Sequence, residues 1–526
     1  DAAAMALDAL GVDALGVNCS LGPKEIAPIL KAMRACTNLP LILKPNAGLP
    51  DPETGVYRTT PEEFAQDCAA LTDVGAAYIG GCCGTTPAFI EALNAALAGR
   101  TASWNEKTVR GICSAGKICE FGKGVRVIGE RINPTGKKRF QQALRENDMN
   151  YIVAQAVEQA DAGAQILDIN VGLPGIDEVD LMRRVVTAIG GAVGLPLQID
   201  SSNPAAIEAG LRAAPGKCLI NSVNASESSL QIVLPLAKKY GAAIVGLALG
   251  ESGLPSSSDE RMAFAQKIVD AAVRQGIPRE DIAIDCLTLT VSAQQDQVKQ
   301  TLEAVARVRN EMGLETVLGV SNISFGLPQR TLVTQAFLTQ AIQSGLTLPI
   351  INPNQKDMMD AVDACRVLSG EDVHCAAYIE RHAAQIKPQT GVQTGAKLSI
   401  EEAIAKGLRD ESAAAARELL AVMPPLDVVE QKLIPALDAV GEQYEKQIIF
   451  LPQLMNAAAA SGAAFDEVRR VIERSGAAGE GKGPIVLATV EGDIHDIGKN
   501  IVKTVLENYG YKVFDLGKNV PPEEIV

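Results

Sequence analysis

A short run near the C-terminus combines residue types that can ligate a metal. Asp493, His495 and Gly498 follow an apolar stretch, Ile485 to Val490, that predicts a strand. Apolar positions after the run recur at helical spacing, so His495 is expected in a strand-to-helix turn. Open α/β sheets bind ligands at that end of their strands. One imidazole nitrogen can face a metal while the other donates to Asp493. The alternative is a structural histidine in a polar turn.

Three cysteines are expected where strands end in the N-terminal region. Cys19 closes a predicted strand that begins at Ala14, and Cys82 and Cys83 follow Gly80 and Gly81 at the end of another. Three thiolates that meet at strand ends, with one coordination position open, suit a catalytic zinc. The alternative is that a buried cysteine is a small hydrophobic residue. We favour that alternative for the cysteines without such placement, which are Cys36, Cys68, Cys218 and Cys365.

Acids and amides end nearly every strand of a second α/β series. In chain order they are Glu130, Asn133, Asp168, Asn170, Asp200, Asn221, Asp285, Asn322 and Asn352. A ring of such groups, poor in Lys and Arg, suits a neutral heterocycle rich in hydrogen-bonding groups, such as a pterin. The alternative for any one of them is helix capping, for which Asp and Asn are also preferred.

Strand and helix signals divide the chain into four segments. Residues 1–100 contain three strand–helix units, as in part of a barrel. Residues 124–387 alternate eight short apolar strands with helices, which is the size and rhythm of a complete (β/α)8 barrel. Residues 398–476 favour about four helices, and residues 482–526 begin a doubly wound α/β domain. The predicted fold class is therefore multidomain α/β, with a polar linker over residues 99–124.

Composition narrows the class of protein. At about 150 residues per domain, 526 residues predict three or four domains. A net charge of −15 argues against nucleic-acid and anionic-membrane partners. No apolar run reaches about 18 residues, so no membrane span is expected. Eleven cysteines without a secretion signal favour reduced thiols and a cytoplasmic location. The chain begins within a helical pattern and stops in an unfinished domain, so we expect a fragment truncated at both ends.

The cysteine motifs resemble the C-terminal part of homocysteine S-methyltransferase domains. That resemblance implies a zinc held by Cys19, Cys82 and Cys83, with homocysteine as the fourth ligand. The second series is similar to the pterin-binding domains of methyltetrahydrofolate methyltransferases, with matches at Gly129-Glu130-Arg131, Asp200-Ser201-Ser202, Asn221-Ser222, Ile284-Asp285 and Gly319-Val320-Ser321-Asn322. The folate-binding residues implied there are Thr135, Gly136, Lys137, Asp200, Asn221, Asp285 and Asn322. Asn322 would also act in catalysis, by following the change at N5 of the folate.

The last two segments resemble the cap and cobalamin-binding domains of cobalamin-dependent methionine synthases. The resemblance implies that His495 ligates cobalt and that Asp493 orients it, both as catalytic residues. The cobalamin-binding residues implied are Glu430, Tyr444, Leu451 and Leu454 in the cap, and Gly492, Asp493, Ile494, His495, Asp496 and Gly498 in the turn. Ordinary bundle core is the alternative for Leu451 and Leu454.

All four segments occur in the order found in that family. The function implied is methyl transfer from 5-methyltetrahydrofolate, through enzyme-bound cobalamin, to zinc-activated homocysteine, giving methionine and tetrahydrofolate. Zinc and cobalamin are the cofactors, homocysteine and 5-methyltetrahydrofolate the substrates, and a reductive reactivation domain or protein a further partner. The alternative function is a corrinoid methyl carrier with a non-folate donor.

Overall fold

The computed structural model describes residues 1–50, 56–383, 398–446, 449, 451–475, 482–488, 503, 506, 511–517 and 520–521. Its contacts form two compact units. The first contains an N-terminal sheet and a closed barrel, and the second contains a helical bundle and a pair of strands. Among the described helices, none is long and apolar enough to cross a membrane.

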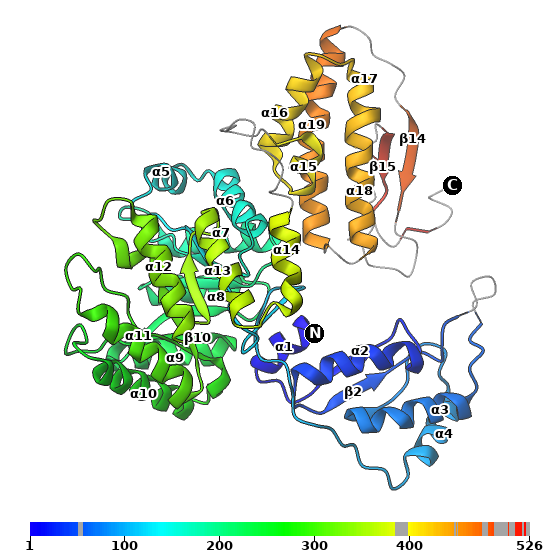
Figure 1. The fold of residues 1–526 in the computed structure, drawn as a ribbon. Helices are drawn as coiled ribbons and strands as arrows, with labels where there is room; N and C mark the ends of the chain where they lie inside the picture. Colours follow the sequence, from blue (N-terminus) through cyan, green and yellow to red (C-terminus); the bar gives the residue numbers. More distant parts are fainter. Residues whose placement is uncertain are drawn as a thin grey trace. The chain divides into compact units, whose positions relative to one another are not determined.

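Eight parallel strands close the barrel, in the spatial order β10-β11-β12-β13-β6-β7-β8-β9. They are β6 (Ile128–Ile132), β7 (Ile166–Ile169), β8 (Leu197–Asp200), β9 (Leu219–Asn224), β10 (Ala243–Leu247), β11 (Ile282–Asp285), β12 (Glu315–Gly319) and β13 (Leu348–Ile351). The helices between and after them, labelled in Figure 1, are α5 (Lys138–Glu146), α6 (Met149–Asp161), α7 (Glu178–Ala192), α8 (Pro204–Ala213), α9 (Glu227–Tyr240), α10 (Ser258–Arg274), α11 (Gln297–Arg307), α12 (Arg330–Gln343), α13 (Lys356–Leu368) and α14 (Ala376–Ala383). The predicted complete barrel is confirmed.

The barrel strands are apolar because helices cover their outer faces and side chains fill the interior. Every residue of β7 and β13 is buried, which explains why these strands appear in the sequence as continuous apolar runs. β6 covers Ile128–Ile132 and so continues past Glu130, which was predicted at the end of a strand. Glu130 and Arg131 suggested a strand end in the sequence, but the pairing of β6 with β7 continues to Ile132.

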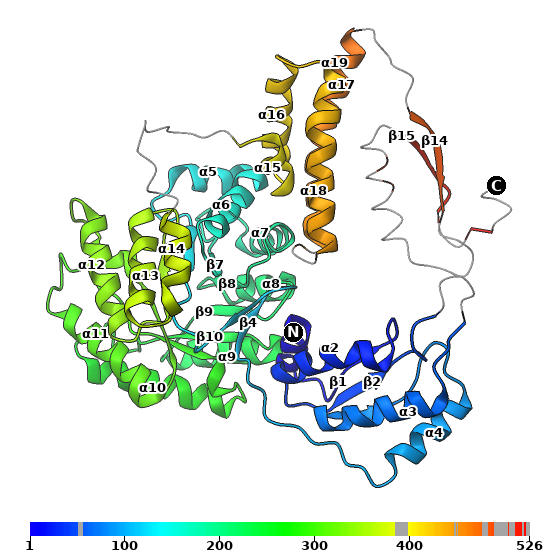
Figure 2. The same ribbon diagram turned by 45° about the vertical axis from the view of Figure 1, so that its right-hand side comes forward.

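The expectation of a polar linker over residues 99–124 is wrong for its second half. β4 (Gly111–Cys113) and β5 (Ile118–Glu120) form an antiparallel hairpin. Ile112, Cys119 and Phe121 share a buried cluster with the first or second residues of most barrel strands. The Cys113 backbone N–H also donates to the Lys217 carbonyl, just before β9, at 3.0 Å. The hairpin therefore closes the amino end of the barrel, and Figure 2 shows β4 beside the barrel strands.

The N-terminal sheet contains three parallel strands in the order β1-β2-β3. They are β1 (Leu15–Asn18), β2 (Leu41–Lys44) and β3 (Ala76–Ile79), with helices α1 (Ala2–Ala9), α2 (Pro23–Cys36), α3 (Pro61–Ala70) and α4 (Pro87–Leu97). The last three helices each begin with proline, which needs no hydrogen-bond partner in the first turn. The strands and helices alternate, so all three strands present their carboxyl ends at one edge of the sheet.

The second unit begins with a helical bundle. Its helices are α15 (Ile400–Ala405), α16 (Arg409–Leu420), α17 (Pro425–Val428), which continues through residues 429–433 into α18 (Ile434–Glu445), and α19 (Leu451–Ser475). Two parallel strands follow, β14 (Lys482–Leu487) and β15 (Tyr511–Asp515). β14 starts three residues before the predicted strand because Lys482 already pairs with Tyr511.

Candidate functional site

The three cysteines singled out in the sequence lie together. Cys19 Sγ is 3.6 Å from Cys83 Sγ, and Cys82 Sγ is 4.0 Å from Cys83 Sγ. All three sulfurs lie within 4.8 Å of one another. Among the described residues, this is the one group of three or more His, Cys, Asp or Glu side chains whose ligand atoms lie so close together. Sulfurs that ligate a tetrahedral zinc at about 2.3 Å are themselves about 3.8 Å apart. The donor set and its spacing therefore fit a zinc with three thiolate ligands.

Backbone hydrogen bonds between loops bring these sulfurs together. The Cys19 N–H donates to the Lys44 carbonyl at 2.9 Å, and the Cys82 N–H donates to the Pro45 carbonyl at 2.8 Å. The carbonyl of Cys83 accepts from the Ala47 N–H at 2.9 Å. Cys19 has a left-handed backbone, with φ of 67°, which turns the chain sharply after β1. The loop after β2 thus links the two cysteine-bearing loops on either side of it.

Sequence reasoning missed two residues beside the thiols. The Asn46 side chain accepts from the Cys83 N–H at 3.1 Å and is buried, at 5% exposure. The Tyr57 ring packs so closely on Gly84 that a β-carbon there would lie 2.4 Å from it. The nearby thiols also raise the pKa of Tyr57, after burial as the larger cause. The glycines on either side of Cys82 and Cys83 allow a tight backbone there, but nothing in the sequence pointed to Asn46 or Tyr57 as the neighbours of the thiols.

The thiols do not share one electrostatic environment. Hydrogen bonding by the Ser20 backbone and then by the other two cysteines lowers the pKa of Cys19. Hydrogen bonding to Cys19 and Cys82 raises the pKa of Cys83. The cysteines interpreted as hydrophobic behave differently: burial raises the pKa of both Cys68 and Cys218 to about 12. Those two thiols stay protonated and unreactive near neutral pH.

At the barrel's carboxyl end, Asp200 is oriented by a neighbouring strand. The Asn170 side chain, just after β7, donates to Asp200 Oδ2 at 2.9 Å. Capping of α8 is instead done by Asn203, whose side chain accepts from the Ala205 N–H at 3.0 Å. The alternative that Asp200 is merely a cap therefore does not hold. Burial raises the pKa of Asp200 to about 6.

A second buried carboxyl lies beside Asp200. Asp168 is 3% exposed and accepts from the Gln198 side chain at 2.6 Å. Burial and then the charge of Asp200 raise the pKa of Asp168 well above its usual range. The charge of Asp200 thus disfavours ionisation of Asp168, because ionising both would place like charges in a poorly solvated site. Asp168 was noted in the sequence only as one member of the polar ring.

Asp285 ends β11 on another side of the mouth. It accepts from the Leu287 N–H at 2.7 Å, and burial raises its pKa to about 7. The loop after it is held by Arg261, a fully buried arginine that donates to the Cys286 carbonyl at 2.8 Å. Arg261 also contacts the side chains of Gln297 and Thr301. These contacts set the position of Asp285.

Asn322 lies in a short 3-10 turn, Val320–Ser324, directly after β12. A β-carbon on Gly319 would lie 2.9 Å from Asn322 Nδ2, so the amide is packed against its own strand end. The neighbouring Ser321 hydroxyl donates to Glu130 Oε1 at 3.0 Å. The first loop lies on the same side: Lys137 Nζ donates to the carbonyls of Glu130 and Arg131, at 2.9 and 3.1 Å.

Burial lowers the pKa of Lys137 to about 8, so this lysine loses its proton more readily than an exposed lysine does. Thr135 and Gly136 precede it in an exposed turn, in which Gly136 has φ of 70°.

A cavity of about 420 Å³ is lined by Asp200 and Asn221, together with Ser202, Asn224 and other residues of the β8 and β9 loops. Asp285 and Asn322 are not among the residues that line it, and their contact with the same ligand stays a prediction.

The residues expected to bind cobalamin are described only in part. Glu430 is exposed, and Tyr444 is 40% exposed on α18. Leu454, on α19, packs partly buried against the bundle core. The Leu451 side chain and the residues Gly492, Asp493, Ile494, His495, Asp496 and Gly498 lie outside what the structure describes. Their roles stay predictions from the sequence.

Family models match the chain in the same order as its structural parts. The Homocysteine S-methyltransferase model matches residues 1–97, and the Pterin binding enzyme model matches residues 129–352. Two B12 binding domain models match residues 399–469 and 483–526. Curated relatives agree with this order. Methionine synthase from Mycobacterium tuberculosis (strain ATCC 25618 / H37Rv) is 32% identical over 99% of this chain. The chain is a relative of methionine synthases.

Its likeness to them extends over the whole chain but not over their whole length. Methionine synthase from Mycobacterium leprae (strain TN) is 30% identical over 100% of this chain. The chain spans about half the length of these relatives, 47% in both cases. A solved dihydropteroate synthase from Xanthomonas albilineans is 21% identical, with a TM-score of 0.39, over 49% of this chain and 98% of that one. No conclusion rests on that likeness.

Proposed function

We propose that this chain contributes to methyl transfer from 5-methyltetrahydrofolate, through cobalamin, to zinc-activated homocysteine, with methionine and tetrahydrofolate as products. The observation that carries the proposal is the convergence of the Cys19, Cys82 and Cys83 sulfurs, within 4.8 Å of one another. It lies in the segment that matches the Homocysteine S-methyltransferase model. The matches to pterin-binding and B12-binding models support the other two parts of the proposal.

The three thiols would hold zinc and leave one position for the thiol of homocysteine. Zinc supplies a Lewis acid that keeps a bound substrate thiol deprotonated, and so nucleophilic, near neutral pH. The role of the protein is to fix the three ligands before the substrate arrives. The hydrogen bonds from Cys19 to Lys44 and from Cys82 to Pro45 would do so, because they tie each ligand loop to the carboxyl end of β2 or to the residue after it.

The barrel mouth would bind the pterin of the folate. Asp200, Asp285 and the amides of Asn221 and Asn322 offer acceptors and donors for its ring edges. Burial raises the pKa of Asp200 to about 6 and that of Asp285 to about 7. These carboxyls can therefore exchange protons with a bound heterocycle near neutral pH. Asn322 can rotate its amide to accept from, or donate to, N5 of the folate as the methyl group leaves.

The helical bundle would cover one face of cobalamin. Tyr444 on α18 and Met455 on α19 are 40% and 52% exposed, and a large, flat ligand could cover either side chain. Cobalamin supplies a cobalt that accepts and donates the methyl group. His495 would ligate this cobalt and Asp493 would orient the imidazole, as the sequence motif implies.

The zinc part of the proposal is tested by metal analysis of the purified chain. The chain should hold about one zinc, and Cys83→Ser should lose most of it because tight binding needs all three thiolates. Cys375→Ser is the matched control, since Cys375 is a free cysteine in the same unit and is not part of the group. Equal zinc in the Cys83 and Cys375 variants would contradict the assignment.

Binding of folate distinguishes the proposed function from its alternative, a corrinoid methyl carrier with a non-folate donor. Isothermal titration with 5-methyltetrahydrofolate should give saturable binding, and Asn322→Ala should impair methyl transfer from folate. The same variant should spare methyl transfer to homocysteine from added methylcobalamin. Absence of folate binding would favour the alternative, and equal loss of both reactions would exclude the role of Asn322.

A further inference from the structure

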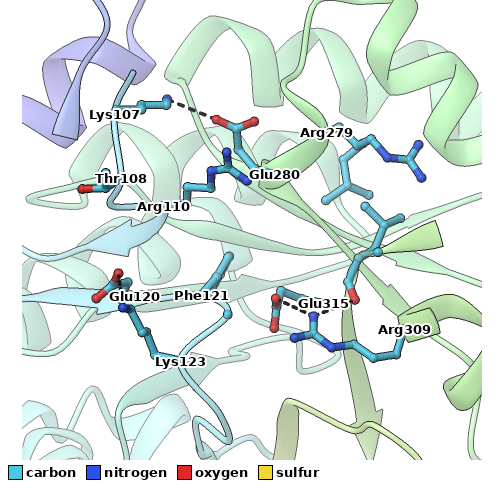
Figure 3. Close-up of a pocket in the computed structure, with 14 residues that line it drawn as sticks. Lys107, Thr108, Arg110, Glu120, Phe121, Lys123, Arg279, Glu280, Arg309 and Glu315 are labelled. Atoms are coloured by element: carbon cyan, nitrogen blue, oxygen red, sulfur yellow. Dashed lines mark hydrogen bonds and ion pairs between the residues drawn. The ribbon is translucent and has the colours of Figure 1, made fainter. Parts of the chain in front are cut away.

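A second cavity lies at the amino end of the barrel, opposite the end that carries Asp200 and Asp285. It has a volume of about 700 Å³. One side is formed by the linker and the β4–β5 hairpin, with Lys107, Arg110 and Lys123. The other side is formed by segments just before β11 and β12, including Arg279 and Arg309 (Figure 3). Its volume is in the range of cavities that hold small organic ligands, about 300–1,000 Å³.

The charge of this cavity is opposite to that of the chain. The chain has a net charge of −15, yet the cavity is lined by five basic and three acidic residues. The acids are Glu120, Glu280 and Glu315. Glu315 pairs with Arg309 at 2.9 Å, and Glu280 pairs with Lys107 at 3.3 Å. Asp8, which is outside the lining, also pairs with Lys107.

Two of the basic residues in the lining, both arginines, take no part in these ion pairs. Within the part of the chain that the structure describes, Arg110 and Arg279 have no carboxylate partner, although Arg279 donates to the Met312 carbonyl at 2.6 Å. Lys123 is only loosely paired with Glu120, at 3.7 Å. The adjacent Asp281 does not offset this charge, because it forms a buried pair with Lys217 at 2.6 Å.

The basic groups are attached to a fixed frame. Arg110 directly precedes β4, and Lys123 follows β5 by three residues. The hairpin between them is anchored in the barrel by Ile112, Cys119 and Phe121, which are at most 8% exposed. Arg279 opens the 3-10 turn that leads into β11. Ligand binding therefore needs side-chain adjustment only, which keeps its entropic cost low.

We propose that this cavity is a binding site for a small organic phosphate. A guanidinium group without a carboxylate partner matches the planar, bidentate geometry of a phosphate group, and the lining contains two, on Arg110 and Arg279. Lys123 adds a third positive charge, and Glu120 can accept from hydroxyl groups on the organic part of the ligand. The site is independent of the proposed methyl transfer, because none of its residues belongs to the thiol group or to the mouth of the barrel.

The test is isothermal titration of the whole chain with inorganic triphosphate as the probe, at about 0.15 M salt. We expect a dissociation constant below about 1 mM for the unmodified chain. The double variant Arg110→Ala/Arg279→Ala should bind triphosphate at least tenfold more weakly, with an unchanged thermal unfolding midpoint. Lys299→Ala is the matched control, since this exposed lysine lies in the first turn of α11 at the other end of the barrel and should leave binding unchanged.

Three results would overturn the proposal of a phosphate site. The first is no measurable binding of triphosphate to the unmodified chain. The second is equal binding by the double variant. The third is equal weakening by Lys299→Ala, because triphosphate would then associate with surface charge in general. Titration with citrate tests the chemical class: binding as tight as that of triphosphate would show that the site selects polyanions rather than phosphates, and would overturn the assignment to phosphate.

Discussion

Single residues decide where the functional side chains of the barrel mouth can lie, and Gly319 is the clearest case. Its backbone φ of −72° is open to any residue, so glycine is needed here for space and not for backbone conformation. A β-carbon would lie 2.9 Å from Asn322 Nδ2. The position of the predicted catalytic amide thus depends on a missing methyl group three residues before it.

We therefore predict that Gly319→Ala displaces the Asn322 amide. Affinity for 5-methyltetrahydrofolate should fall by about tenfold, equivalent to about 1.4 kcal/mol, while the fold is retained. Isothermal titration measures the affinity, and the thermal unfolding midpoint checks the fold. Gly441→Ala is the control, because no atom outside its own helix lies within 4 Å of a β-carbon there. Unchanged affinity in Gly319→Ala would show that Asn322 does not contact the folate.

Asp285 gives a second residue-scale prediction, on pH. Its pKa is raised from 3.8 to about 7 by burial, so the folded chain binds this proton more tightly than the unfolded chain does. Its contribution to stability is therefore greatest below pH about 4 and decreases as pH rises to about 7. Asp285→Asn removes this dependence while its side-chain oxygen can still accept from Leu287.

Urea unfolding at pH 5 and pH 8 measures the effect. The loss of unfolding free energy between these two pH values should be smaller in Asp285→Asn than in the unmodified chain, by at least about 1 kcal/mol. Each protein is compared with itself at the two pH values, and the two losses are then compared with each other. The contributions of other titrating groups, including Asp200, are present in both losses and cancel. An identical loss in both proteins would mean that Asp285 is already ionised in the folded chain at pH 5.

At the scale of elements, the β4–β5 hairpin is as much a part of the barrel as its strands. Ile112 is fully buried and belongs to the same cluster as residues of most barrel strands. Ile112→Ala should lower the free energy of unfolding by about 2–5 kcal/mol, as truncation of a packed core residue does. Leu368→Ala should change it by less than about 0.5 kcal/mol, since Leu368 is 86% exposed.

Denaturant unfolding of both variants checks this prediction. A change for Ile112→Ala as small as that for Leu368→Ala would mean that the hairpin does not contribute to the barrel's stability. The same measurement bears on the phosphate cavity, because Arg110 and Lys123 are placed by this hairpin. A loosened hairpin should weaken triphosphate binding without touching a basic residue.

At the scale of the whole molecule, the chain consists of two compact units with separate cores. We predict two unfolding transitions in differential scanning calorimetry. Addition of 5-methyltetrahydrofolate at about 100 times its dissociation constant should stabilise the barrel transition by about 2.7 kcal/mol and leave the other in place. A single transition that shifts as one would show that the units unfold together.

The sequence by itself determined the features that depend on neighbouring residues. Alternating apolar strands and helices predicted the barrel, because secondary structure follows local periodicity. Cys82 and Cys83 were predicted at the end of a strand, next to glycines that allow a tight backbone there. Helix α3 also begins where local signals place it, with a capping box formed by Thr60 and Glu63. In each case the interacting groups are a few residues apart.

Only the tertiary structure decided which distant residues meet. Cys19 and Cys83 are 64 residues apart, and the order of β1, β2 and β3 brings them within 3.6 Å. Asn46 and Tyr57 join them, although neither belongs to a recognisable motif. The sequence did not predict the hairpin because its apolar residues form only two short runs, Ile112-Cys113 and Ile118-Cys119, in a polar segment. Their burial depends on the open end of the barrel. Helix capping was the alternative for Asp200, and only the structure showed that Asn203 caps α8 while Asp200 accepts a hydrogen bond from Asn170.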